Sequence, residues 1–102
     1  MLSVIIPNWN GARLLPVCLN ALRQQTCRDF ETIVVDDAST DESRELIARD
    51  FPEVRVVALT PNRGFAPAVN EGIRTARGAV IVLLNNDTEA DANWLAEIVR
   101  AL

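Results

Sequence analysis

The sequence predicts an α/β domain, a doubly wound, mainly parallel four-stranded sheet with helices on both faces. Short apolar runs rich in β-branched residues alternate four times with segments whose apolar residues recur at helical spacing. The connections are too short for anything but right-handed crossovers, which make consecutive strands parallel. A chain of 102 residues has room for one domain, residues 1–102.

The predicted strands are runs of four to six residues that stop at turn or polar residues. Pro7 follows the first run, Asp36 and Asp37 follow the second, and Pro61 lies just after the third. The fourth run is apolar at every position, as is typical of a strand that is covered on both faces. We place the strands at 2–6, 32–35, 54–59 and 80–84.

The predicted helices have an apolar face and recognisable boundaries. Ser39 or Thr40 is placed to cap the second helix, Pro52 ends it, and Gly78 terminates the third. We place the helices at 12–25, 42–50, 65–76 and 91–102. The residues expected in the core from these segments are Cys18, Phe65, Trp94 and Leu95.

Composition excludes several classes of protein. The net charge of −4 argues against nucleic acid as a partner, because phosphate binding needs an excess of basic residues. All ten basic residues are Arg, and there is no His, which excludes Schiff-base chemistry, a Walker loop, Ser-His-Asp triads and His-ligated zinc. No run approaches the ~18 apolar residues that cross a bilayer. We expect a cytoplasmic location, at most peripheral to the inner face of the membrane.

All four strands end in polar or aromatic residues. In a parallel sheet these ends meet at one edge, where α/β proteins bind ligands. Together they offer an aromatic surface, carboxylates, an arginine and a candidate metal ligand, an inventory that suits a nucleotide with a diphosphate. The segments are Pro7 to Asn10, Asp36 and Asp37, Thr60 to Gly64, and Asn85 to Asp87.

The last of these segments is open to two interpretations. Asn and Asp are common turn residues, and Asp87 with Thr88 could cap the next helix. Alternatively, Asp87 is a metal ligand, since a phosphate-bound Mg²⁺ or Mn²⁺ takes only one or two protein carboxylates. The segment alone does not separate the two, but convergence with three other strand ends favours a metal–diphosphate site.

Five segments are distinctive in combination: 4–11 (VIIPNWNG), 19–26, 31–41 (ETIVVDDASTD), 62–72 and 84–88. In these segments and in their order, the chain resembles the inverting glycosyltransferases of family 2, which have the GT-A fold. This implies transfer of a sugar from a UDP- or dTDP-sugar donor to a glycan or lipid-linked acceptor, with the Rossmann-like nucleotide-binding half of that fold present here. Within the family, the chain looks most like the rhamnosyltransferase-type branch.

The resemblance implies roles for individual residues. Pro7 and Trp9 would line the base and ribose site, and Asp37, with Asp36, would hydrogen-bond the pyrimidine. Asp87 would bind the metal that bridges the diphosphate. The implied nucleotide-binding residues are Pro7, Asn8, Trp9, Asp36, Asp37, Arg63, Asn85 and Asn86.

Two of these positions need comment. Arg63 could approach the base or phosphates, or could equally be a solvated loop residue. Asn85 stands where the family motif usually has the first of two carboxylates, and an amide oxygen binds a hard cation more weakly.

The resemblance also implies what is absent. In this family the general base lies well beyond the metal motif, so no catalytic residue is assigned and the chain is expected to be the nucleotide-binding part of a transferase, as an excised domain or a truncated gene. The alternative is a non-catalytic nucleotide-binding or interaction module.

An apolar edge strand at 80–84 further predicts self-association as a homodimer.

Overall fold

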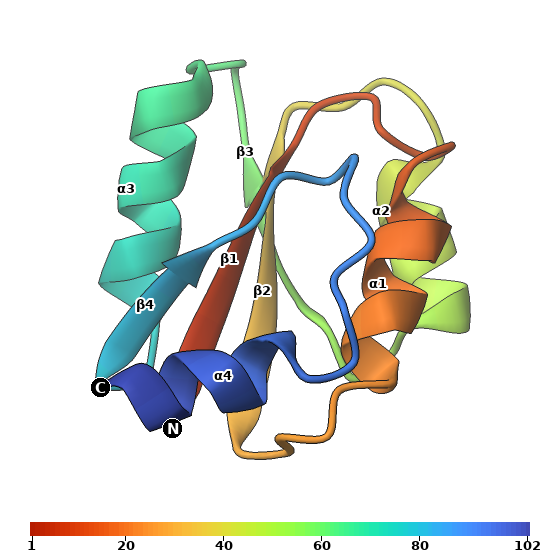
Figure 1. Ribbon diagram of the computed structural model, residues 1–102. Helices are drawn as coiled ribbons and strands as arrows, with labels where there is room; N and C mark the ends of the chain where they lie inside the picture. The colour runs from red at the N-terminus through yellow and green to blue at the C-terminus, as the bar shows by residue number, and fades with distance from the viewer.

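The computed structural model describes residues 1–102 and contains one four-stranded sheet (Figure 1). Its strand order is β3-β2-β1-β4, and all three pairings are parallel. The predicted α/β class is confirmed, and each strand lies within three residues of its predicted bounds. The strands are β1 (Leu2–Asn8), β2 (Phe30–Asp37), β3 (Arg55–Leu59) and β4 (Val80–Leu83).

The helices cover both faces of the sheet unequally. Figure 1 shows α3 on one side of the sheet and α1 and α2 on the other, and Leu95 of α4 belongs to the same core as the buried residues of α1 and α2. Each predicted helix exists, but the first begins three residues later than expected and so does the last. The helices are α1 (Leu15–Arg23), α2 (Ser43–Asp50), α3 (Phe65–Thr75) and α4 (Trp94–Ala101).

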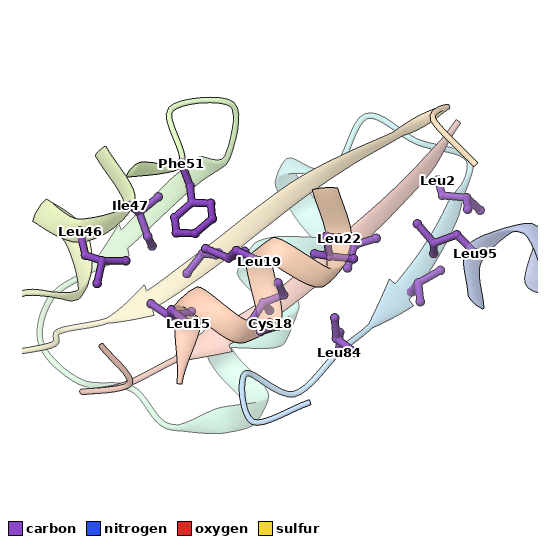
Figure 2. Packing of buried hydrophobic residues seen from close by; sticks show 14 residues of the cluster. Leu2, Leu15, Cys18, Leu19, Leu22, Leu46, Ile47, Phe51, Leu84 and Leu95 are labelled. Atoms are coloured by element: carbon purple, nitrogen blue, oxygen red, sulfur yellow. The ribbon is translucent and has the colours of Figure 1, made fainter. Parts of the chain in front are cut away.

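The larger core lies on one face of the sheet, between the strands and the helices α1, α2 and α4 (Figure 2). Successive strand residues point to opposite faces, so Leu2, Val4 and Ile6 of β1 enter this core while Ile5 does not. The predicted core residues Cys18 and Leu95 are fully buried in it, and Trp94 packs against it. Complete burial of one such aliphatic side chain stabilises the fold by about 1.5–3 kcal/mol.

The smaller core lies under α3, where the helix comes very close to the sheet. It contains Ile5 of β1 and Ile33 and Val35 of β2. Gly72 of α3 is buried against them: a Cβ atom there would lie 2.5 Å from Ile5 Cγ2 and 2.9 Å from Val35 Cγ2. A helix can approach the sheet this closely only where a residue has no side chain.

Two expectations differ from the structure. Of the two expectations for the strand at 80–84, cover on both faces is wrong, because Leu83 is 50% exposed, whereas the apolar edge strand is confirmed, since β4 lies at one end of the strand order. The expected cap of α2 by Ser39 or Thr40 is also wrong. Instead Asp41 accepts the backbone N–H of Ser43 at 2.9 Å. None of the four helices has the length and apolar character needed to cross a membrane.

We predict that Gly72→Ala destabilises the fold by about 1–2 kcal/mol. Overpacking of a tight core costs ~1–3 kcal/mol, which exceeds the ~1 kcal/mol that Ala gains over Gly in a helix. Urea denaturation measures the difference. Asn70→Ala, at an exposed position of the same helix, is the control and should change stability by less than ~0.5 kcal/mol. Equal stability of Gly72→Ala and the native chain would contradict the close packing.

Candidate functional site

A cleft of about 380 Å³ lies at the carboxyl edge of the sheet, where the strand ends converge. It is lined from the ends of all four strands and from the first turn of α3. Seven residues predicted for the site are among its walls, whereas Asp36 and Arg63 are not. The lining residues are Pro7, Asn8, Trp9, Asp37, Asn62, Gly64, Phe65, Ala68, Asn85, Asn86 and Asp87.

Asp36 and Asp37 point in opposite directions because side chains alternate along β2. Asp36 points to the same face of the sheet as Val34, which belongs to the larger core. Asp37 points to the same face as Ile33 and Val35, which lie under α3. The adjacent carboxylates therefore serve different structures. Only Asp37 reaches the cleft.

Asp37 holds the loop between β3 and α3. Its carboxylate accepts the backbone N–H of Arg63 at 2.7 Å and of Gly64 at 2.8 Å, and its carbonyl accepts the Asn62 side-chain amide at 3.0 Å. Each carboxylate oxygen keeps acceptor capacity, since a carboxylate has about four lone-pair sites. Asp37 can thus fix the loop and still accept a hydrogen bond from a ligand.

The expected contact of Asp36 with a nucleotide is not compatible with its position. The side chain is completely buried. It accepts hydrogen bonds from Asn8 Nδ2 at 3.1 Å, from the Ser39 hydroxyl at 2.6 Å and from the Ser39 backbone N–H at 3.1 Å, and Arg44 lies 3.6 Å away. A buried carboxylate needs such partners, which is also why Ser39 does not cap α2.

The loop after β3 contributes different residues from the one predicted. The Arg63 side chain is exposed and outside the cleft, and only its backbone takes part, through Asp37. The sequence did mark the loop as a strand end. The sequence does not show which residues of the loop face inward, and the two that line the cleft are Asn62 and Gly64.

Phe65 was expected in the core but is 63% exposed and lines the cleft. It shares a helix face with Ala68 and Gly72, both buried, so its spacing correctly indicates that face. However, α3 begins at Phe65, beside the carboxyl ends of the strands. Phe65, in the first turn of α3, therefore lies beyond the sheet and over the cleft. Trp9, which is 59% exposed, is a second aromatic wall.

The segment Asn85 to Thr88 is both a turn and part of the cleft. The backbone N–H and the hydroxyl of Thr88 donate to the Asn85 carbonyl at 3.3 and 2.7 Å. Asp87 does not cap α4, which begins only at Trp94. Its exposed carboxylate makes no hydrogen bond or ion pair within the protein and is free for a ligand.

Cys18 of α1 contacts this turn from the core. Its thiol donates a weak hydrogen bond to the Asn85 carbonyl at 3.8 Å. Burial raises the pKa of Cys18 to about 11, although a hydrogen bond with Thr88 opposes the shift. The group therefore stays a neutral thiol at neutral pH and is not a nucleophile.

The donor set of the cleft fits a metal ion only if a ligand brings further donors. No three His, Cys, Asp or Glu side chains are close enough together to hold a metal by themselves. The free Asp87 carboxylate and the neighbouring amides are oxygen donors of the kind that Mg²⁺ and Mn²⁺ prefer. Because no Arg lines the cleft, an anionic ligand would need such a cation.

We predict that Asp37→Asn loosens the loop after β3 and costs about 1–3 kcal/mol of stability. An amide can accept only one of the two backbone N–H groups and turns its own NH₂ toward the other. Chemical denaturation without ligand measures the loss. Asp87→Asn is the matched control, because that carboxylate has no partner. Equal stability of the two variants would contradict the role given to Asp37.

Comparisons with known proteins identify the family of this chain. The model of the family described as glycosyl transferase family 2 matches residues 3–102. A PGL/p-HBAD biosynthesis glycosyltransferase of Mycobacterium tuberculosis is 35% identical over 102 residues, which cover 96% of this chain and 40% of the relative. The glycosyltransferase GlyG of Streptococcus pneumoniae is 33% identical, over 98% of this chain and 34% of its own.

Solved structures show the same fold. The crystal structure of S. aureus TarS 1–349 in complex with UDP has a TM-score of 0.90 and 26% identity, over 97% of this chain and 31% of that one. The mannosyltransferase PcManGT from Pyrobaculum calidifontis, in complex with GDP-Man and Mn²⁺, has a TM-score of 0.85 and 32% identity over the same shares. The chain thus spans about a third of these proteins. It belongs to glycosyltransferase family 2.

Proposed function

We propose that the cleft binds a nucleotide-diphosphate sugar donor together with Mg²⁺ or Mn²⁺, for inverting sugar transfer to a glycan or lipid-linked acceptor. The observation that carries the proposal is the meeting of Asp37, two aromatic walls and the free Asp87 carboxylate in one cleft of about 380 Å³. Membership of the family supports it. So do related structures that contain UDP, UDP-GlcNAc, or GDP-Man with Mn²⁺.

The nucleobase would lie between Trp9 and Phe65, close to Asp37. Stacking of a base on an aromatic side chain contributes about 1–3 kcal/mol. A remaining lone pair of Asp37 can accept the ring N3–H of uracil or thymine, a donor that cytosine lacks. The arrangement therefore favours a UDP- or dTDP-sugar over a CDP-sugar. A deoxyhexose donor, as in the rhamnosyltransferase-type branch, is the finer proposal.

The diphosphate would lie toward Asp87, which would hold the cation. When bound, the metal neutralises the diphosphate and the negative charge that develops on the departing nucleotide. Asn85 and Asn86 can accept or donate hydrogen bonds beside it. Asp37 and Asp87 are the only carboxylates that line the cleft. In this arrangement Asp37 would hold the loop and the base and Asp87 would hold the cation, so neither would take the acceptor's proton. The role proposed for residues 1–102 is therefore donor binding.

Cytoplasmic location and a homodimer through the exposed edge of β4 stay predictions. The non-catalytic alternative, a nucleotide-binding or interaction module, differs from an enzyme in one observable. It would bind the donor without turnover.

Nucleotide titrations test the proposal directly. We predict that UDP and dTDP raise the melting temperature by several degrees, more in the presence of Mn²⁺ than without it, and that CDP does so less. Asp87→Asn should remove the Mn²⁺-dependent part and leave the metal-free part. Asp91→Asn, an exposed residue outside the cleft, is the control. A chain whose melting temperature responds to none of these nucleotides would contradict donor binding.

A second prediction concerns the aromatic walls. Trp9→Ala and Phe65→Ala should each weaken UDP binding by about 5- to 100-fold, because each removes a stacking surface worth ~1–3 kcal/mol. Isothermal titration calorimetry measures the dissociation constants. Ile73→Ala, an exposed apolar residue of α3 that does not line the cleft, should bind UDP like the native chain. Unchanged affinity in Phe65→Ala would place the base elsewhere.

A further inference from the structure

A chain of polar side chains leads from the buried Asp36 to the surface of the cleft. Asn8 Nδ2 donates to Asp36 Oδ1 at 3.1 Å, and Asn86 Nδ2 donates to Asn8 Oδ1 at 2.8 Å. The chain ends beside Asp87. Each asparagine amide has a donating NH₂ and an accepting oxygen, so the orientation of one amide determines the orientation of the next.

The direction is fixed at the buried end. A carboxylate such as Asp36 can only accept hydrogen bonds. Ser39 Oγ donates its one proton to Asp36 at 2.6 Å, so it can only accept from its other neighbours. It accepts the backbone N–H of Asn10 at 2.9 Å and the Asn8 side-chain NH₂ at 3.4 Å. Asn8 faces two acceptors and must turn its NH₂ toward them. Its oxygen is thereby directed at Asn86.

Asn86 receives this orientation from Asn8. It turns its NH₂ toward the Asn8 oxygen, so its own Oδ1 faces away. That oxygen accepts no hydrogen bond within the protein, and the only buried side-chain nitrogen or oxygen without a partner is Arg55 Nε. Asn86 Oδ1 is therefore open to solvent on a residue that lines the cleft.

Gly11 makes room for this contact. A Cβ atom at Gly11 would lie 2.2 Å from Asn8 Oδ1 and 2.4 Å from Asn86 Nδ2. Any larger residue would push apart the two atoms that transmit the orientation.

We infer that Asp36 and Asn8 are positioning residues that hold the Asn86 amide with its oxygen toward the cleft, so that this oxygen and the Asp87 carboxylate face one divalent cation. The inference rests on the proposed function. The opposite amide orientation would present an NH₂ to the cation, which repels it. Groups behind the ligands of a metal commonly change its affinity by about 10- to 100-fold.

A double-mutant cycle tests the orientation of the Asn8 and Asn86 amides without any nucleotide. Asn86→Asp places a carboxylate oxygen against Asn8 Oδ1, and Asp36 prevents Asn8 from turning over. Asp36→Asn supplies an NH₂ at the buried end, which allows Asn8 to turn and to donate to the carboxylate introduced at position 86 in the double variant. Each single variant should lower the melting temperature by about 5 °C or more, and the double variant should recover part of the summed loss.

Asp50→Asn, Asn20→Asp and their combination form the matched control cycle, because both residues are exposed. Their effects should be small and additive. Additive losses in the cycle of Asp36→Asn and Asn86→Asp would overturn the inference. If Asp36→Asn alone does not fold, a folded double variant supports the inference and an unfolded one overturns it.

A second measurement concerns the cation. Isothermal titration of UDP with and without Mn²⁺ gives the gain in affinity that the metal provides. Asn86→Ala should lower UDP affinity about 10-fold more in the presence of Mn²⁺ than in its absence, whereas the control Asn20→Ala, at an exposed position outside the cleft, should change neither affinity. An equal loss in both conditions, or no loss, would overturn the inference. If the native chain binds no UDP at all, the proposed function fails, and the nucleotide-free cycle still tests the direction of the chain.

Discussion

The buried carboxylate of Asp36 is the constraint on which the carboxyl edge of the sheet depends. An ionised group that is completely removed from water costs several kcal/mol unless hydrogen bonds and a counter-charge offset it. Its partners come from the end of β1, from the loop after β2 and from α2. Satisfying one charge therefore requires three separate segments to take up one arrangement, which apolar packing alone would not specify.

The cleft follows from this arrangement. Asp37, one residue further along β2, points to the other side and fixes the loop before α3, while Asn8 extends the polar contacts from Asp36 to the turn after β4. The loops after β2, β3 and β4 are thus attached to the last residues of the sheet by hydrogen bonds, and the loop after β1 is bonded to the loop after β2. A site that is held in place before a ligand arrives loses less conformational entropy on binding.

The sequence predicts the elements well and the directions of side chains less well. Apolar runs and turn residues locate every strand and helix, since these signals are local. The sheet order β3-β2-β1-β4 depends on contacts between distant segments. Asp36 and Asp37 look equivalent in the sequence, because only the parity of β2 relative to the two cores decides which of them reaches the cleft. Phe65 was misplaced because helical spacing reveals a face of α3 but not where the sheet beneath it ends.

The central claim is that a nucleotide diphosphate and a divalent cation bind together beside Asp87. Line broadening by Mn²⁺ in the nuclear magnetic resonance spectrum of the ¹⁵N-labelled chain tests it most directly, because a paramagnetic ion broadens the amide signals nearest to it. With UDP present, Mn²⁺ should selectively broaden the signals of residues 85–88 and of Asn8 and Trp9, and Asp87→Asn should abolish the effect. Broadening that is the same with and without UDP, or that is spread over acidic residues outside the cleft, would contradict the account.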